Sequence, residues 1–178
     1  AGMRSDLFEA RKSERPFNFS DIVHPIPIGF KQISEGDKIE MGGRTWDIRV
    51  DHGHAPDHAT FWSCDDRLVL SGDQIIPSIS SNIGVYPTEP DANPLKEWMI
   101  SCERLKQFSK GDQLALPGHK LPFSGMPLRL TQLLENHNGA LDRLRLDLKK
   151  PKTAGDVMPA IFKRHSEDSE YSLGLVEA

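Results

Sequence analysis

The sequence predicts an α+β fold, in which short strands come first and helices dominate the last third of the chain. Polar and apolar residues alternate over 37–41 and 44–50, on either side of Gly42-Gly43, which indicates a β-hairpin. Apolar runs at 59–64 and 67–71 predict two more strands, and a further one is predicted at 113–116. Apolar residues recur at helical spacing over 94–108 and from about 126 to 150, which predicts two long helices.

The hairpin is the first element that the pattern defines sharply, and its register follows from the two-residue turn. Ile39 and Met41 are expected to share a face with Trp46, Ile48 and Val50. Before it, residues 1–23 predict a linker or an N-terminal helical segment, in which 1–16 are charged and any helix ends by Pro16. Residues 17–30 are rich in Phe and Pro and suit an extended segment laid over a core.

After the hairpin, the strands at 59–64 and 67–71 are apolar throughout instead of alternating, which predicts burial on both faces. Residues 77–94 are rich in Ser, Asn, Pro and Gly and predict a long loop. This loop is a candidate wall of a substrate site, although an inert surface loop is nearly as well supported.

Capping residues mark where the helices begin. Asp91 or Asn93 can cap the first long helix, with Pro94 at its first position. Pro151 ends the second long helix, and a shorter third helix follows it, capped by Thr153 or Asp156. Pro159 fits that third helix only if it falls in the first turn. The last residues, 173–178, look like the start of another helix.

Composition limits the classes of protein that this chain can represent. Its 178 residues, 37% hydrophobic and 27% charged, suit one domain or one domain with a small appendage. A net charge of -4 gives no global basic field, so any contact with nucleic acid would depend on a local patch. No apolar run approaches the roughly 20 residues that span a bilayer, and residues 1–6 lack the apolar core of a signal peptide. Cys64 and Cys102 are expected to be buried thiols in a reducing compartment, which favours the cytoplasm and no membrane partner.

The chemistry-bearing residues gather where predicted strands end. His52, His54 and His58 lie in a turn containing Gly and Pro, directly after the strand that ends near Val50. Asp73 follows the strand ending at Ser71, and His119 follows a Pro-Gly turn after Leu116. Metal sites are commonly built from His and Asp side chains at strand ends that the fold brings together. The repetition of this device at three strands predicts a metal centre.

Three motifs, in this order, carry a family resemblance: Gly53-His54-Ala55-Pro56-Asp57-His58, Leu70-Ser71-Gly72-Asp73 and Pro117-Gly118-His119. They resemble the third, fourth and fifth metal motifs of the metallo-β-lactamase-fold hydrolases. The chain is most similar to the bacterial group related to glyoxalase II and to lactamase-like proteins with a C-terminal winged-helix region. The resemblance implies an αββα sandwich with a two-zinc centre at one edge of two packed sheets. Residues 24–124 would form the C-terminal half of that domain, and 125–178 a truncated, helical winged-helix-like region.

The resemblance also implies a role for each residue of the candidate site. His54 would bind the first metal, Asp73 would bridge the two metals and orient the nucleophile, and His119 would be the last ligand of the second metal. His58 would lie beside the metals without binding them, and His52 would be incidental. Residues that contact substrate stay unknown at this stage.

One family motif is missing from the 178 residues: the His-x-His-x-Asp-His sequence that supplies two ligands to each metal. The chain is therefore expected to be the C-terminal part of a longer zinc-dependent hydrolase, in which metal-bound hydroxide attacks a thioester or ester of a small-molecule substrate. Alone, it is expected to bind zinc weakly or not at all and to be inactive.

Two other functions stay open, as does the oligomeric state. The first is RNA phosphodiester cleavage, suggested by the winged-helix resemblance and a basic stretch. That stretch is more simply a solvated helix face, because Asp142 and Asp147 interleave it. The second is a metal-free, non-catalytic module that acts as a folding or dimerising half. The basic stretch consists of Arg143, Arg145, Lys149, Lys150 and Lys152.

Overall fold

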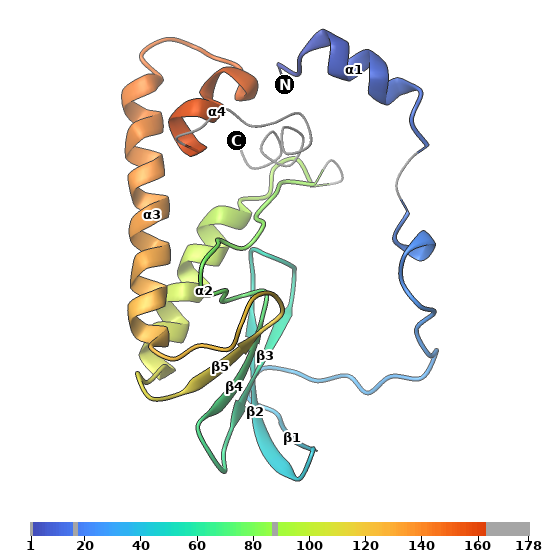
Figure 1. Ribbon diagram of the computed structural model, residues 1–178, viewed down its shortest axis with the longest axis vertical. Coiled ribbons are helices and arrows are strands. Elements are labelled where there is room, and N and C mark those ends of the chain that lie inside the picture. Colours follow the sequence, from blue (N-terminus) through green and yellow to red (C-terminus); the bar gives the residue numbers. More distant parts are fainter. Residues whose placement is uncertain (1, 16–17, 87–88, 163–178) are drawn as a thin grey trace.

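Ten elements make up the computed structural model, which describes residues 2–15, 18–86 and 89–162. The five strands form one sheet in the order β1-β2-β3-β4-β5, and α2 and α3 lie against one face of it (Figure 1). In chain order the elements are α1 (Ser5–Lys12), the 3-10 turn η1 (Phe19–Asp21), β1 (Lys38–Met41), β2 (Arg44–Asp51), β3 (His58–Ser63), β4 (Leu68–Gly72), α2 (Pro94–Phe108), β5 (Leu114–Pro117), α3 (Met126–Asp147) and α4 (Ala154–Phe162).

The predicted hairpin is confirmed. Gly42 and Gly43 both have positive φ, 61° and 73°, as the tight turn between two antiparallel strands requires. Ile39 pairs with Trp46, so the two side chains share a face. The turn chemistry and the strand pattern therefore agree, which is why this element could be predicted from local sequence.

The strand order places two strand ends side by side. β2, β3 and β4 are antiparallel neighbours, whereas β5 pairs with β4 in parallel, with Leu70 opposite Leu116 and Gly72 opposite Pro117. Parallel neighbours end at the same edge of a sheet. The residues that follow β4 and β5 consequently emerge together.

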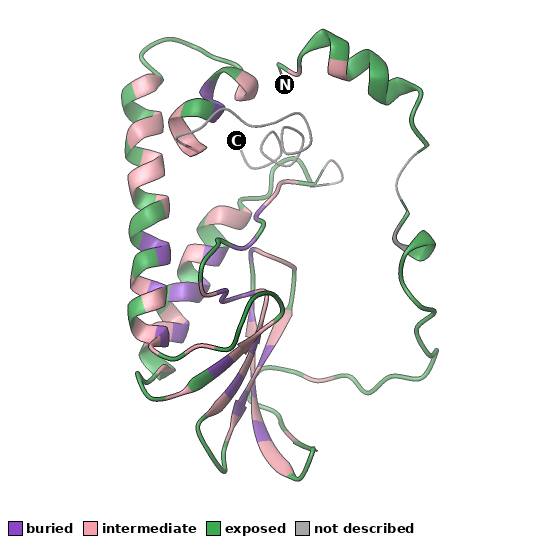
Figure 2. Cartoon of the chain, in the orientation of Figure 1, coloured by how far each residue is buried: buried purple, intermediate pink, exposed green. Residues whose placement is uncertain are grey.

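The core lies between the sheet and the helices α2 and α3. Trp98, Cys102 and Leu105 from α2 are fully buried there against Leu130 and Leu133 of α3. Asn93 caps α2, since its side-chain Oδ1 accepts a hydrogen bond from the backbone N–H of Lys96 at 3.1 Å. The predicted helical stripes are thus confirmed, and purple buried segments in Figure 2 mark the surface where α2, α3 and the sheet meet.

The opposite face of the sheet is only partly covered, and here the prediction of strands buried on both faces is wrong. Phe61 pairs with Leu70, and Leu70 pairs with Leu116, so the three side chains share that face. All three are only half-buried. The described helices lie against the other face, where Val69 and Ala115 are fully buried.

The segment before the sheet also departs from expectation. Residues 22–31 form an arm that runs away from the sheet instead of lying over a core (Figures 1 and 2). Ile26, Ile28 and Phe30 are 85%, 98% and 89% exposed. The prolines at 25 and 27 keep this segment extended as predicted, but none of the described elements lies beneath its apolar side chains.

Two smaller predictions are wrong, and a third concerns residues outside those that the structure describes. Pro159 lies inside α4 instead of in its first turn, and Cys64 is exposed instead of buried. The expectation for residues 173–178 falls outside the described residues. None of the described helices is long and apolar enough to cross a bilayer.

His137 on α3 makes the stability of the helix packing depend on pH. Its ring packs edge-on against Trp98 of α2, with 4.8 Å between ring centroids, and burial lowers its pKa below the usual 6.5. A lowered histidine pKa contributes stability above the unfolded pKa, and this stability is lost as pH falls through the folded pKa.

Acidification from about pH 6.5 is therefore expected to lower the free energy of unfolding, and His137→Gln is expected to flatten this dependence. Urea unfolding at several pH values measures both slopes. His24→Gln, which removes an exposed histidine from the arm, is the matched control. An equal slope in wild type and His137→Gln would contradict the assignment.

Candidate metal centre

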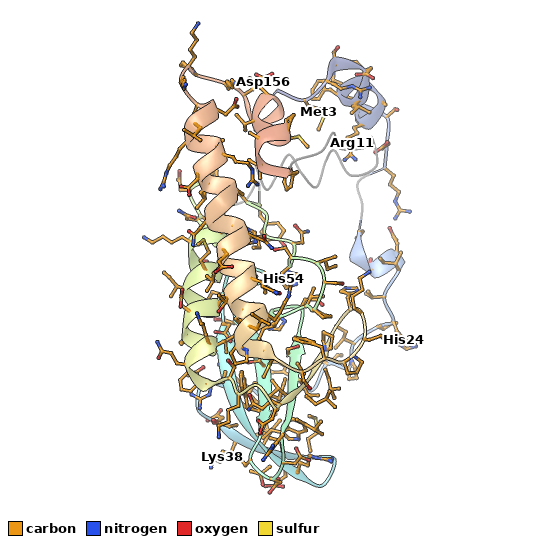
Figure 3. All side chains as sticks on the ribbon, turned by 60° about the vertical axis from the view of Figure 1, so that its left-hand side comes forward. Met3, Arg11, His24, Lys38, His54 and Asp156 are labelled. Carbon is orange, nitrogen blue, oxygen red and sulfur yellow. The ribbon has the colours of Figure 1, made fainter. Side chains whose placement is uncertain are left out.

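The candidate centre lies at the edge where β4 and β5 end and β2 turns into β3. Asp73 directly follows β4, and His119 follows β5 after Gly118, whose N–H donates to the Gly72 carbonyl at 2.9 Å. His54 comes from the loop between β2 and β3. Figure 3 shows His54 in the middle of the molecule, far from His24 on the arm. The structure thus brings His54, Asp73 and His119 together at one edge of the sheet.

A tight turn delivers His54 to this edge. Gly53 before it has a φ of 105°, and a Cβ atom there would lie 2.3 Å from the Trp98 Cβ and 2.5 Å from the Trp98 backbone nitrogen. Only glycine combines this φ with such a close approach to α2. The loop after β2 is therefore pressed onto the start of α2, which fixes where His54 begins.

The tautomer of His54 is set by a backbone carbonyl. Its Nδ1 lies 2.8 Å from the carbonyl oxygen of Asn82. Because a carbonyl can only accept, Nδ1 must carry the proton, and in the neutral ring Nε2 then holds a free lone pair. This Nε2 lies 3.7 Å from Asp73 Oδ2. Two acceptors that face each other repel unless the ring is protonated or a cation lies between them.

Asp73 stands between the two histidines. Its Oδ2 is 3.7 Å from His54 Nε2 and 3.5 Å from His119 Nε2. Its Oδ1 is buried and has no hydrogen-bond partner among the described residues. A Cβ atom at Gly118 would lie 2.3 Å from that oxygen, so the missing side chain of Gly118 makes room for the carboxylate.

The other two histidines of the motif behave differently from each other. His58 is half-buried over Gly72, and its ring centroid lies 5.8 Å from that of His54. Its pKa is lowered, mainly by burial and next by the nearby His54. Its Nδ1 is also buried without a hydrogen-bond partner in the described chain. His52 is half exposed, and its Nδ1 accepts from the N–H of Asp57 at 3.4 Å. Among the described residues, Asp73 is thus paired with His54 and His119 and with neither of these rings.

The donor atoms fit part of a zinc centre. Two ligand atoms of one tetrahedral zinc, each about 2.1 Å from the ion, are about 3.4 Å apart. Both Nε2–Oδ2 separations are close to this distance. However, no group of three or more His, Cys, Asp or Glu side chains in residues 2–15, 18–86 and 89–162 is placed to hold a metal ion. Asp73 thus forms two pairs, one with each histidine, and each pair is short of the three ligands that a catalytic zinc uses.

Sequence reasoning missed the residues that position these side chains through the backbone. Ser81 Oγ donates to the backbone carbonyl of Asp73 at 2.5 Å, and Asn82 offers its own carbonyl to His54. Both belong to the 77–94 loop, for which the sequence predicts only a wall of a substrate site. Its Ser- and Asn-rich composition was the available signal, but a carbonyl contact is independent of residue type.

Comparisons with known proteins concern the family and the fold of this chain. The sequence profile of the metallo-beta-lactamase superfamily matches residues 5–150. A beta-lactamase domain protein from Burkholderia ambifaria is similar in structure over 98% of this chain and 50% of its own, at 32% identity and a TM-score of 0.89. A metallo-beta-lactamase family protein from Thermus thermophilus is similar over 91% of this chain and 52% of its own, at 27% identity and a TM-score of 0.74.

A more distant likeness concerns the fold alone. A metallo-beta-lactamase from Staphylococcus aureus covers 82% of this chain and 47% of its own, at 15% identity and a TM-score of 0.54. The chain spans about half the length of each of these three structures. No curated protein sequence matches it at the same level of significance.

Proposed function

Because the chain belongs to the metallo-β-lactamase superfamily, we propose that it is part of a zinc-dependent hydrolase that cleaves a thioester or ester of a small molecule. The observation that carries this proposal is the carboxylate oxygen of Asp73 between two imidazole nitrogens. In the neutral ring of His54 the facing nitrogen carries a lone pair, since the other ring nitrogen donates to the Asn82 carbonyl. A bound cation would remove the repulsion between these acceptors.

The remaining ligands are proposed to come from residues outside this chain. The 178 residues contain no His-x-His-x-Asp-His motif, and relatives of known structure are about twice as long. Further predictions belong with this proposal: kinship with the glyoxalase II group, a winged-helix-like end, and the half-covered sheet face as the contact for a second sheet. Phe61, Leu70 and Leu116 would pack there.

The side chains of this chain would hold and orient the reacting groups. Zinc, when bound, lowers the pKa of a water molecule toward about 7, so that hydroxide is available at neutral pH. His54 and His119 would each offer Nε2, and Asp73 would offer Oδ2 to both sides. Asn82 would keep His54 in the required tautomer. The half-buried His58, whose pKa is lowered, would help to exclude water from the inner side of the centre.

Metal analysis tests the proposal most directly. We expect the complete protein to hold about two zinc ions per chain and to hydrolyse thioesters or esters, whereas the 178-residue chain alone binds zinc weakly. Zinc content after dialysis, followed by a panel of acyl thioesters and esters with and without a chelator, measures both. His24→Ala on the arm is the control, because His24 is exposed and lies far from the centre. A complete protein without zinc, or a zinc-loaded one that hydrolyses neither substrate class, would refute it.

The RNA-cleaving alternative has less support from the basic stretch than its sequence suggested. Arg143 donates to the carbonyls of Gly139, Ala160 and Ile161, so it is partly buried. Arg145 and Lys152 pair with Asp142 and Asp147. The alternative remains a prediction, and a salt-dependent affinity for RNA would be its signature.

A further inference from the structure

A cavity of about 380 Å³ lies behind the loop that positions the candidate centre. Its volume falls in the range of about 300 to 1,000 Å³ that is usual for small-molecule sites. The 77–94 loop, the start of α2, and α3 with α4 surround it, and none of His54, Asp73 and His119 lines it. Its walls are mostly apolar, formed by Ile83, Leu95, Leu141, Leu144, Ile161 and Phe162.

One face of α3 lines the cavity over about two turns. His137, Ala140, Leu141 and Leu144 all line it, which is the spacing of one helix face. At 1.5 Å per residue, the run from His137 to Leu144 covers about 10 Å. This length accommodates an extended apolar chain along α3.

One end of this run is polar but uncharged at neutral pH. Ser80 Oγ lies 2.7 Å from His137 Nε2, and the ring of His137 packs edge-on against Trp98. Burial lowers the pKa of His137 below its usual value, which keeps the imidazole neutral at pH 7. This end of the cavity offers hydrogen bonds without adding a charge.

The other end carries the guanidinium of Arg143, for which residues 2–15, 18–86 and 89–162 provide no carboxylate in a salt bridge. Arg143 lines the cavity and uses Nε, Nη1 and Nη2 to donate to the carbonyls of Ala160, Gly139 and Ile161, at 2.8, 2.9 and 2.8 Å. Carbonyls satisfy three of its five N–H groups but leave its charge, and no carboxylate of the described chain is found in a salt bridge with it. An anion brought beside it would gain a charge-assisted hydrogen bond.

We propose that this cavity binds a small amphipathic carboxylate, with the apolar chain along α3 and the carboxylate at Arg143. The apolar walls provide the burial, and the guanidinium selects an anion over a neutral chain of the same length. This site is separate from the metal centre and is independent of the proposed hydrolysis. Three consecutive residues connect the cavity to that centre by hydrogen bonds. Ser80 bonds to His137, Ser81 donates to the Asp73 carbonyl, and the Asn82 carbonyl accepts from His54.

Calorimetric titration of the complete protein with octanoate tests the proposal. We expect saturable binding at least about tenfold tighter than that of octan-1-ol, which has the same chain without the charge. Ala140→Phe fills the cavity from α3 and should weaken octanoate binding by at least about tenfold. Asn138→Phe places the same side chain on the exposed side of α3 and should change the affinity by less than about twofold.

A second readout separates this cavity from direct binding of the carboxylate to zinc. Octanoate is expected to shift the imidazole NMR signals of His137, and the shift should be lost in Ala140→Phe. Absence of saturable binding, equal affinities for octanoate and octan-1-ol, or undiminished binding by a folded Ala140→Phe variant would overturn the proposal. Binding at the metal alone would give this last result, because residue 140 lies outside the metal centre.

Discussion

Replacing Asp73 with asparagine is expected to lower kcat/KM of the complete enzyme by on the order of a thousandfold or more. Asparagine has nearly the same shape as aspartate but carries no negative charge, so the backbone turn at Gly72 and Gly118 would be retained. The oxygen that faces both His54 and His119 would lose the charge that draws a metal ion to each pair. Steady-state kinetics and zinc content, measured on the same preparation, should fall together.

Asp57→Asn is the matched control for this experiment. Asp57 belongs to the same histidine motif, but its side chain is 82% exposed and is placed beside His52. Asp57→Asn removes one carboxylate charge, as Asp73→Asn does, but leaves the pairs of Asp73 with His54 and His119 in place. Activity and zinc content should therefore stay close to wild type. Wild-type kinetics in Asp73→Asn would show that the centre lies elsewhere, whatever the zinc content.

The parts of the fold that could be predicted from sequence are those set by neighbours in the chain. Gly42-Gly43 with alternating flanks specifies a hairpin, and Asn93-Pro94 before an apolar stripe specifies a helix start. The parallel pairing of β4 with β5 could not be read in this way, because more than forty residues separate the strands. The burial of each sheet face could not be predicted for the same reason, because it depends on whether another layer of the fold packs against that face. Leu70 is an apolar strand residue whether or not such a layer is present.

The candidate site divides along a similar line. His54, Asp73 and His119 could be found because each follows a strand and has a ligand-type side chain. Their nearness, however, depends on the shared edge of β4 and β5. The contacts of Ser81 and Asn82 could not be predicted because both involve backbone carbonyls. The Ser81 hydroxyl donates to the carbonyl of Asp73, and the carbonyl of Asn82 accepts from the His54 ring. Whether these side chains bind metal stays a prediction until zinc is measured.

Gly53→Ala is expected to reduce the free energy of unfolding by more than about 4 kcal/mol, a large part of the roughly 5 to 15 kcal/mol of a typical domain. Two costs coincide at this position. The φ of 105° is one that side-chain-bearing residues rarely adopt, and the added Cβ would lie within 2.6 Å of backbone atoms of Trp98 and Pro94. Backbone atoms at the start of α2 cannot swing aside as a flexible side chain can, so the loop and α2 must separate.

Alanine variants of two other glycines, measured by urea unfolding, distinguish the cost of the positive φ from the cost of the steric clash. Gly43→Ala has a positive φ of 73° but open space around the added atom, so it should cost about 1 to 2 kcal/mol. Gly111→Ala has neither a positive φ nor a close neighbour and should stay within about 0.5 kcal/mol of wild type. If Gly53→Ala lost no more stability than Gly43→Ala, the loop would be free to move off α2. The position of His54 would then depend on its contact with Asn82 instead of on the packing of Gly53.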